Sequence, residues 1–307
     1  MAEKVAKSAA ARVRKLTKRQ EKQQAKKDTR KHSKIPSSFN IVGQVFYIFR
    51  TNWRLLLGIV VVYLILNIIF ASGLGTISTS IDSIKGNLQH HGQISSAASS
   101  FGGLIFSAGS GSSQTGAVLQ TLLIVMESLV IIWALRHILA NQEISVKDAY
   151  YRSMMPLIPF MLVIGIIILQ LLPVVLGSAI VSTVLSAVFN SSSGVNIVFG
   201  IIFALLAAWT IYMLSSSIFA LYIVTLPDMQ PLKALRSAEN LVKFRRWQVL
   251  RRLLFLPIFV TAAMAIIIIP LIVWVTFLAA PVFYFFSMVT ILFVHTYLYS
   301  LYRSLLE

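Results

Sequence analysis

The stretch from Leu226 to Leu256 reads LPDMQPLKALRSAENLVKFRRWQVLRRLLFL and lies between two long apolar runs. Its first half predicts an amphipathic helix, because apolar and charged residues recur at helical spacing. Asp228 is a candidate cap, and Pro231 suits a first helical turn because its missing N–H has no partner there. The expected apolar face comprises Leu232, Leu235, Ala238, Leu241 and Val242.

The second half of this stretch carries a cluster of Arg and Trp side chains at the edge of an apolar run. Such clusters are typical of the membrane–water interface. We therefore expect a cytoplasmic helix that leads into a membrane span, with the cluster contacting lipid headgroups. The expected headgroup-contacting residues, including two before the first apolar run, are Trp53, Arg54, Arg245, Arg246, Trp247, Arg251 and Arg252.

The composition excludes an ordinary soluble domain. The 307 residues are 57% hydrophobic and 12% charged, with a net charge of +17 and no cysteine, so disulfide and thiolate chemistry are absent. Because roughly 20 apolar residues cross a bilayer as a helix, the pattern predicts an all-α, polytopic membrane domain over 35–307 with six transmembrane helices. Their expected ranges are 55–74, 117–139, 155–180, 197–226, 253–277 and 281–302, the last two joined by a turn at 279–281.

Charge patterning predicts the orientation of the chain. Residues 1–34 form a basic, polar stretch that we interpret as a disordered cytoplasmic tail. Of the 27 Lys and Arg residues, only Lys85 falls in the Gly/Ser-rich loop 75–115, which is therefore expected outside. The prediction is a bacterial inner (plasma) membrane protein with both termini in the cytoplasm.

The basic tail has two physical interpretations. Anionic lipid attracts juxtamembrane Lys and Arg, whereas RNA or DNA would attract them through counterion release. The tail lacks the interleaved aromatic residues that stack on bases. Anionic lipid headgroups are therefore the favoured partner, ahead of nucleic acid or the ribosome.

A threefold pattern runs through the chain. Segments 36–50, 145–153 and 231–243 each predict a cytoplasmic interfacial helix before an outgoing span. Phe39, Val42, Phe46 and Phe49 mark the expected apolar face of the first, and Ser145 is an expected cap of the second. FRTNWRLLL at 49–57 and FRRWQVLRR at 244–252 place two Trp residues in equivalent positions. The repeat unit is one interfacial helix and one helix hairpin.

The run ALYIVTLPDMQPLKALRSAENLVKFRRWQVL at 220–250 resembles a loop of bacterial membrane proteins related to the membrane domain of glycerophosphodiester phosphodiesterases. The resemblance covers about residues 120–300. The matching positions are Pro227, Ala234, Ala238, Arg246 and Trp247. These 307 residues contain no soluble phosphodiesterase domain, so the resemblance does not imply that activity.

Glu127 is the one carboxylate inside an expected span, and such a group is by default a functional candidate. Counted at about 1.5 Å per residue, Gln170, Ser215, Ser216 and Ser217 fall near the same depth. Such a cluster would bind a cation, relay a proton or hold a polar solute. The alternative is an uncharged Glu127 that is hydrogen-bonded to Gln170 and joins two spans.

Other polar residues give weaker indications. His295 is expected nearer the inside, bonded to a carbonyl of a span rather than joined to Glu127 in a relay. Asn67 is expected to contribute to packing. His90 and His91 have no neighbouring carboxylate cluster and make a poor ligand set, so neither a metal site nor a cofactor is predicted. The sequence contains no nucleophile elbow, phosphate-binding loop or dinucleotide-binding motif.

These observations predict a non-catalytic integral membrane protein, a scaffold or accessory subunit that interacts with anionic lipid or a membrane partner. A small-solute or ion transporter that uses a polar site in mid-membrane is the alternative. An insertase-like protein with a ribosome-binding tail is a third.

Overall fold

A computed structural model describes residues 36–71, 81–82, 84–85, 101–103, 114–188 and 193–306. These residues form helices and their connections, and six of the helices are long and apolar enough to cross a membrane. The chain is therefore an all-α, multi-pass membrane protein, as the sequence predicts. The predicted tail, most of the predicted loop, and His90 and His91 lie outside the described residues.

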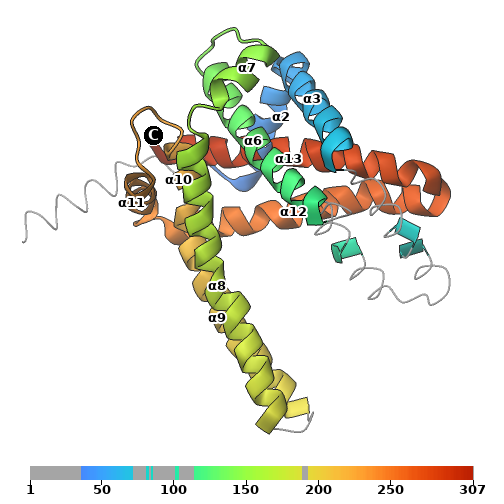
Figure 1. Ribbon diagram of the computed structural model, residues 1–307, viewed down its shortest axis with the longest axis vertical. Coiled ribbons are helices and arrows are strands. Elements are labelled where there is room, and N and C mark those ends of the chain that lie inside the picture. Colours follow the sequence, from blue (N-terminus) through green and yellow to red (C-terminus); the bar gives the residue numbers. More distant parts are fainter. Residues whose placement is uncertain are drawn as a thin grey trace, which may run out of the picture.

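The long helices form three hairpins, and a short helix precedes each hairpin (Figure 1). The first unit comprises α2 (Ser38–Thr51), α3 (Trp53–Ala71) and α6 (Gln114–Ile138). The second comprises α7 (Val146–Ser153), α8 (Leu157–Val188), α9 (Ser193–Ser217) and the single turn α10 (Ala220–Ile223). The third comprises α11 (Pro231–Val242), α12 (Arg246–Trp274) and α13 (Thr276–Leu306).

The three units contact one another in a closed ring. The short helix of each unit packs against the returning long helix of the unit before it: α7 on α6, α11 on α9, and α2 on α13. The outgoing long helix follows the same rule, because α8 contacts α6, α12 contacts α9, and α3 contacts α13. The last unit thus packs against the first, and the threefold repeat predicted from the sequence is present in the packing.

The three short helices bury the same two positions, counted from their N-caps. The caps are Ser37, Ser145 and Gln230. The fourth and eighth residues after each cap share one helix face. Exposure at these positions is at most 1%: Ile41 and Val45 in α2, Ala149 and Ser153 in α7, and Ala234 and Ala238 in α11. The small residues of α7 and α11 allow close approach of two helices, as small residues do within membranes.

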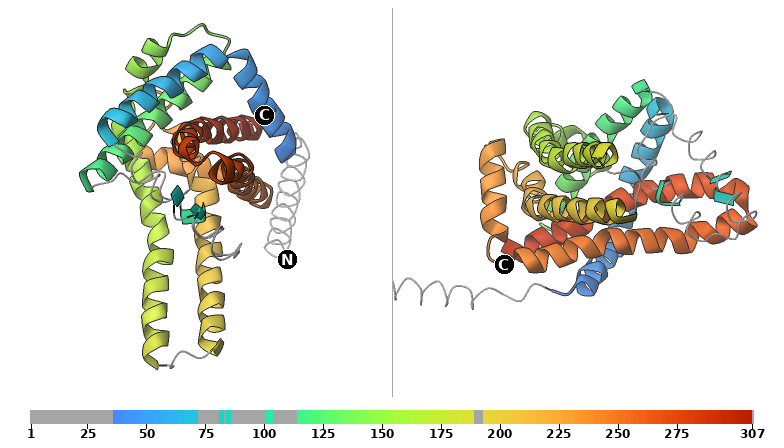
Figure 2. Two further views of the ribbon diagram at one scale, coloured as in Figure 1. Left: turned by 90° about the vertical axis from the view of Figure 1, so that its right-hand side faces the viewer. Right: turned by 90° about the horizontal axis from the view of Figure 1, so that it is seen from below.

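The hairpins meet at the end where the short helices lie, and they diverge at the opposite end (Figures 1 and 2). We call the meeting end the basic end, because Arg54, Arg136, Arg152 and Arg246 belong to its helix termini. The tip of α8–α9 and the turn of α12–α13 point in different directions. The second hairpin consequently packs chiefly within itself and against α11 and α12.

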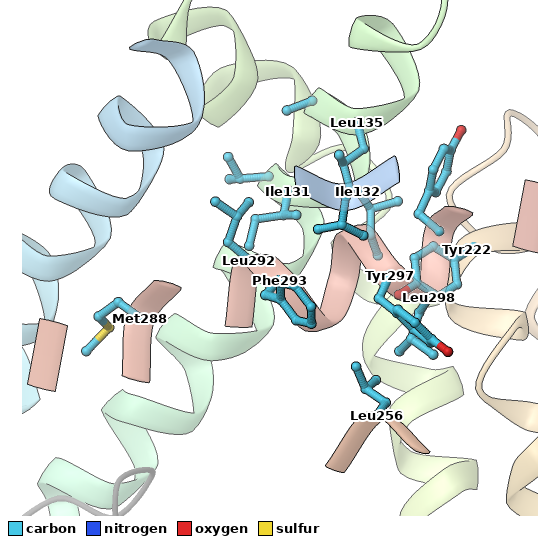
Figure 3. Packing of buried hydrophobic residues seen from close by; sticks show 14 of the residues in the cluster. Ile131, Ile132, Leu135, Tyr222, Leu256, Met288, Leu292, Phe293, Tyr297 and Leu298 are labelled. Atoms are coloured by element: carbon cyan, nitrogen blue, oxygen red, sulfur yellow. The ribbon is translucent and has the colours of Figure 1, made fainter. Parts of the chain in front are cut away.

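The core lies where α6 packs against α13. Ile131 and Ile132 of α6 are fully buried, and Leu292 of α13 is 3% exposed. Figure 3 shows these side chains together with Phe293 and Tyr297 of α13. Of the apolar stretch of α6, 61% is buried, more than for the other long helices, so α6 is the central helix of the ring.

Three helix boundaries differ from the sequence prediction. α8 does not end near residue 180 but continues through Pro173 to Val188. α12 begins at Arg246, seven residues before the predicted span, and α13 begins at Thr276. The turn between them lies at Val275, and Pro281 sits inside α13 rather than in a turn. In lipid, unpaired backbone groups are costly, so helices continue through proline where an apolar sequence allows it.

Two predicted apolar faces coincide only in part with the faces that pack on protein. Leu232 of α11 is 65% exposed, and the buried face is Ala234, Ala238 and Val242. In α2, Phe39 and Phe46 are exposed, whereas Ile41, Val42, Val45 and Ile48 are buried. The compact residues face the protein because they permit close packing, and the largest apolar residues remain on the outer face.

Capping agrees with the prediction at one of two sites. Ser145 caps α7, since its Oγ accepts a hydrogen bond from the Asp148 amide at 3.1 Å. Pro231 occupies the first turn of α11, as expected. Asp228 is not a cap: it lies in the loop before α11 with φ of 58°, in the left-handed region, while Gln230 holds the cap position. An Asp tolerates that conformation better than most residues do.

Candidate functional site

Glu127 lies at the junction of the first and second units and is 2% exposed. Its Oε2 is 2.8 Å from the hydroxyl of Tyr150, which α7 brings to the side of α6. The same hydroxyl lies 3.1 Å from the backbone oxygen of Ile59 in α3. One phenol therefore links α7 to both long helices of the first hairpin.

The number of available protons limits which hydrogen bonds the Tyr150 hydroxyl can make. The Tyr150 hydroxyl carries one proton, yet it has two oxygen neighbours, Glu127 Oε2 and Ile59 O. Burial raises the pKa of Tyr150, so its proton stays in place. Both contacts are full hydrogen bonds when a protonated Glu127 donates to Tyr150 and Tyr150 donates to Ile59. The geometry fits an uncharged carboxyl with a structural role.

A second polar chain begins at the next residue of α6. Ser128 Oγ donates to the Ile124 carbonyl at 2.7 Å and lies 3.0 Å from Nε2 of His295. The other ring nitrogen, Nδ1, lies 3.2 Å from the Tyr222 hydroxyl. Because the Ser128 proton is already used, His295 donates from Nε2 and accepts from Tyr222 at Nδ1. A neutral imidazole satisfies every partner.

Arg136 continues this network at the basic end of α6. Its guanidinium donates to the Thr225 carbonyl at 2.8 Å, to the Thr225 hydroxyl, and to the Tyr222 carbonyl at 3.3 Å. These contacts hold the connection after α10 against α6. The network joins all three units, since Arg136 belongs to the first, Tyr222 to the second and His295 to the third.

The structure does not bring the predicted cluster together. Glu127 bonds to Tyr150, and among the described residues the buried Oε1 of Gln170 has no partner, so the expected bond between Glu127 and Gln170 is wrong. Ser215 donates to the Tyr212 carbonyl within its own helix; Ser216 and Ser217 likewise donate to Met213. Equal depth did not imply proximity, because α8 and α9 diverge from α6 toward the far end of the hairpins.

His295 also differs from the prediction. It bonds to a serine and a tyrosine side chain rather than to a carbonyl of a span, and Ser128 is adjacent to Glu127 in sequence. Asn67, in contrast, packs as expected: it is fully buried, and its Oδ1 accepts a hydrogen bond from Tyr284, which joins α3 to α13.

Sequence reasoning missed Ser128, Tyr150 and Tyr222. Tyr150 belongs to a segment predicted to lie at the interface, where tyrosine is common. Its side chain reaches Glu127 because Ala149 buries α7 tightly against the first hairpin. No periodicity in the sequence indicates which hairpin an interfacial helix joins, so the contact could not be predicted.

The expected headgroup residues occupy the starts of α3 and α12. Trp53 and Trp247 are both exposed, and Arg54 lies 5.6 Å from the Trp53 ring centre. Arg246 pairs with Glu239 at 2.9 Å and lies over the Tyr212 ring. Arg251 is exposed and Arg245 partly so, while Arg252 donates to the Pro36 carbonyl at 2.8 Å. Contact of this set with lipid headgroups stays a prediction.

Cavities lie between the described helices. One of about 550 Å³ opens at the basic end, between α6, the α7–α8 junction and the loop before α11. Another of about 240 Å³ lies between α3, α6, α12 and α13, where Tyr63, Gln120, Ser287 and Thr290 supply polar groups. In the described part of the chain, no three His, Asp or Glu residues are placed to hold a metal ion.

Comparison with known proteins gives no assignment. No family model matches the chain, and no curated protein or solved structure matches it. The resemblance to proteins related to the glycerophosphodiester phosphodiesterase membrane domain therefore stays a prediction.

Proposed function

We propose that the chain is a non-catalytic integral membrane protein, a scaffold or accessory subunit that assembles with a membrane partner and interacts with anionic lipid. The proposal places the basic end and both termini in the cytoplasm of a bacterial cell, with the six long helices in the inner membrane. Lys and Arg residues at the ends of the long helices support that orientation.

The observation that carries the proposal is the exposure of α8 and α9. Their apolar stretches are only 11% and 6% buried, compared with 61% for α6. Leu169 of α8 and Leu205 of α9 are each more than 60% exposed. A helix pair that contributes so little to the core of its own protein offers its surface to lipid or to another membrane helix.

The polar groups of the interior support a structural role. Glu127 and His295 have protein partners that satisfy them in uncharged forms, and Arg136 is held by the oxygens of Tyr222 and Thr225. Each contact joins helices of different units. Hydrogen bonds of this kind stabilise helix packing in membranes.

Photo-cross-linking in native membranes tests the assembly role. A benzophenone amino acid at Leu169 or Leu205 should give a protein adduct of discrete mass. The matched control is Val163 of α8, which is fully buried and should cross-link within the chain. Adducts with lipid alone at both exposed positions would contradict a role in assembly.

A transporter is the second candidate, and the 240 Å³ cavity favours it. The cavity lies among four long helices and contains both polar and apolar side chains, as small-molecule sites do. If the chain carries a solute, Gln120→Leu should abolish its flux into vesicles, and Glu127→Gln should also impair it. Unchanged flux in Gln120→Leu would exclude this cavity as the pathway, and unchanged flux in Glu127→Gln would exclude a role for that carboxyl, which does not line the cavity. An insertase-like role depends on residues 1–34 and is tested by ribosome association after their deletion.

A further inference from the structure

The larger cavity, of about 550 Å³, lies at the basic end, and both Arg136 and Arg152 line it. Among the described residues neither has a carboxylate within ion-pair distance, although Asp148, one turn before Arg152 on α7, attracts it at longer range. The partners of Arg136 are carbonyl and hydroxyl oxygens, which leave its positive charge uncompensated. Asp228 is the one acidic residue in the lining, so the cavity carries an excess of positive charge.

The deeper wall of the cavity is apolar. Leu129, Trp133 and Arg136 follow one another along α6 at spacings of four and three residues, so they share one helix face. From Leu129 to Arg136 the wall extends about 10 Å along the helix axis. Pro156 and Pro159 also line the cavity, where α8 begins. The cavity is therefore cationic toward the basic end and apolar toward the interior of the membrane.

The position of Trp133 marks the level of the interface. Its ring stacks on His137 with centres 3.8 Å apart, which fixes it beside the cavity. Tryptophan is enriched at the headgroup level of membranes. The start of α8 adds a weak positive potential, since a helix N-terminus favours negative charge within its first turn. The site thus changes from charged to apolar as a phospholipid does, from phosphate to acyl chain.

We propose that this cavity binds one anionic phospholipid, with its phosphate at Arg136 and Arg152 and the start of an acyl chain against Leu129 and Trp133. The volume suits such a ligand, since small-molecule sites commonly measure about 300–1,000 Å³. A free phosphate would use the arginines but leave the apolar wall uncovered. The proposal rests on the membrane role proposed above, and it adds a specific lipid site to it.

Native mass spectrometry of the full chain in detergent tests the site by titration with phosphatidylglycerol. Arg152 is exposed and donates no hydrogen bond to another described residue, so Arg152→Gln should not disturb the fold. Loss of one juxtamembrane cation corresponds to about fivefold weaker binding of the first lipid. Lys147→Gln is the matched control, because Lys147 is exposed on the same helix outside the cavity and its loss should leave that affinity unchanged.

A variant that removes a negative charge, and should therefore strengthen lipid binding, provides a second test. Asp228→Asn removes the one acidic group of the lining, and Asn tolerates the left-handed backbone at this position. It should strengthen the binding of phosphatidylglycerol about fivefold. An unchanged affinity in both Asp228→Asn and Arg152→Gln would overturn the proposal.

Three further results decide among the remaining explanations. An equal loss of phosphatidylglycerol affinity in Arg152→Gln and Lys147→Gln would show diffuse attraction to the protein surface rather than binding at one site. Equal binding of phosphatidylcholine and phosphatidylglycerol would overturn selectivity for an anionic lipid. Complete displacement of the lipid by millimolar inorganic phosphate would identify a soluble anion as the ligand. Loss of the lipid site with the α8–α9 adducts retained would leave the assembly role standing.

Discussion

The bond between Tyr150 and Glu127 is the sharpest test of how the units are joined. Tyr150→Phe removes the hydroxyl that lies 2.8 Å from Glu127 Oε2 and 3.1 Å from the Ile59 carbonyl. Interhelical hydrogen bonds in membrane proteins are worth about 0.6–1.7 kcal/mol in double-mutant cycles. A buried polar group without a partner costs about 1–3 kcal/mol. We therefore expect Tyr150→Phe to lower the free energy of unfolding by about 1–3 kcal/mol.

A double-mutant cycle isolates the pair. Glu127→Leu should cost about 0.6–2 kcal/mol, and the double variant should cost less than the sum, with a coupling energy of about 0.6–1.7 kcal/mol. Glu127→Gln should stay near wild type at pH 7, because an amide keeps the shape and a donor. Tyr151→Phe is the control, since Tyr151 is 83% exposed on the same helix. Unfolding would be measured by circular dichroism in mixed micelles, and additive costs would refute the reasoning.

Three further predictions concern orientation, depth and packing. The chain lacks cysteine, so a single introduced cysteine is the only site that a maleimide can label. Lys85→Cys should react with an impermeant maleimide in intact cells, whereas Gln20→Cys and Asn240→Cys should react only after permeabilisation. Labelling of position 240 in intact cells would contradict the predicted orientation. Variants that retain either Trp53 or Trp247 alone should show equal quenching by lipids brominated near the headgroup, and quenching from the bilayer centre would contradict their equivalence. Gly58→Ala would place a Cβ 2.8 Å from Cγ2 of Val146, so it should lower the free energy of thermal unfolding by about 1–3 kcal/mol. Val146→Ala should relieve this loss. An equal loss in the double variant would show that α3 and α7 do not meet there.

The sequence carried enough information to predict the six spans and the three short helices. Apolar runs of sufficient length and the Ser145 cap are local signals, and local signals define helices. The repeat was also visible, because Trp53 and Trp247 stand in equivalent positions before their long helices. The end of α12 at Trp274 was not visible, because the apolar sequence continues without a polar turn signal into α13.

Side-chain partners were harder to predict from the sequence than helices. Counting residues from the membrane surface gave Glu127 and Gln170 a similar depth, but two residues at the same depth can still lie far apart in the plane of the membrane. The angle between hairpins decides the partner, and that angle arises from packing of small residues such as Ala149 and Ala234 against the preceding hairpin. The faces of α2 and α11 that pack on protein were not predictable either, because hydrophobicity does not distinguish a face that packs on protein from one that faces lipid.

The closed ring of three units is the central claim about the fold, and the polar network depends on it. Phe39 of α2 and Phe255 of α12 belong to the first and last units, and their ring centres lie 5.2 Å apart. In the absence of other cysteines, Phe39→Cys combined with Phe255→Cys should be joined by a short bifunctional thiol reagent in native membranes. The matched pair Phe39→Cys and Val273→Cys should not react, because Val273 lies 18 residues further along α12, about 27 Å along its axis. Efficient cross-linking of the first pair alone is the result predicted, and equal or absent cross-linking in both pairs would contradict the ring.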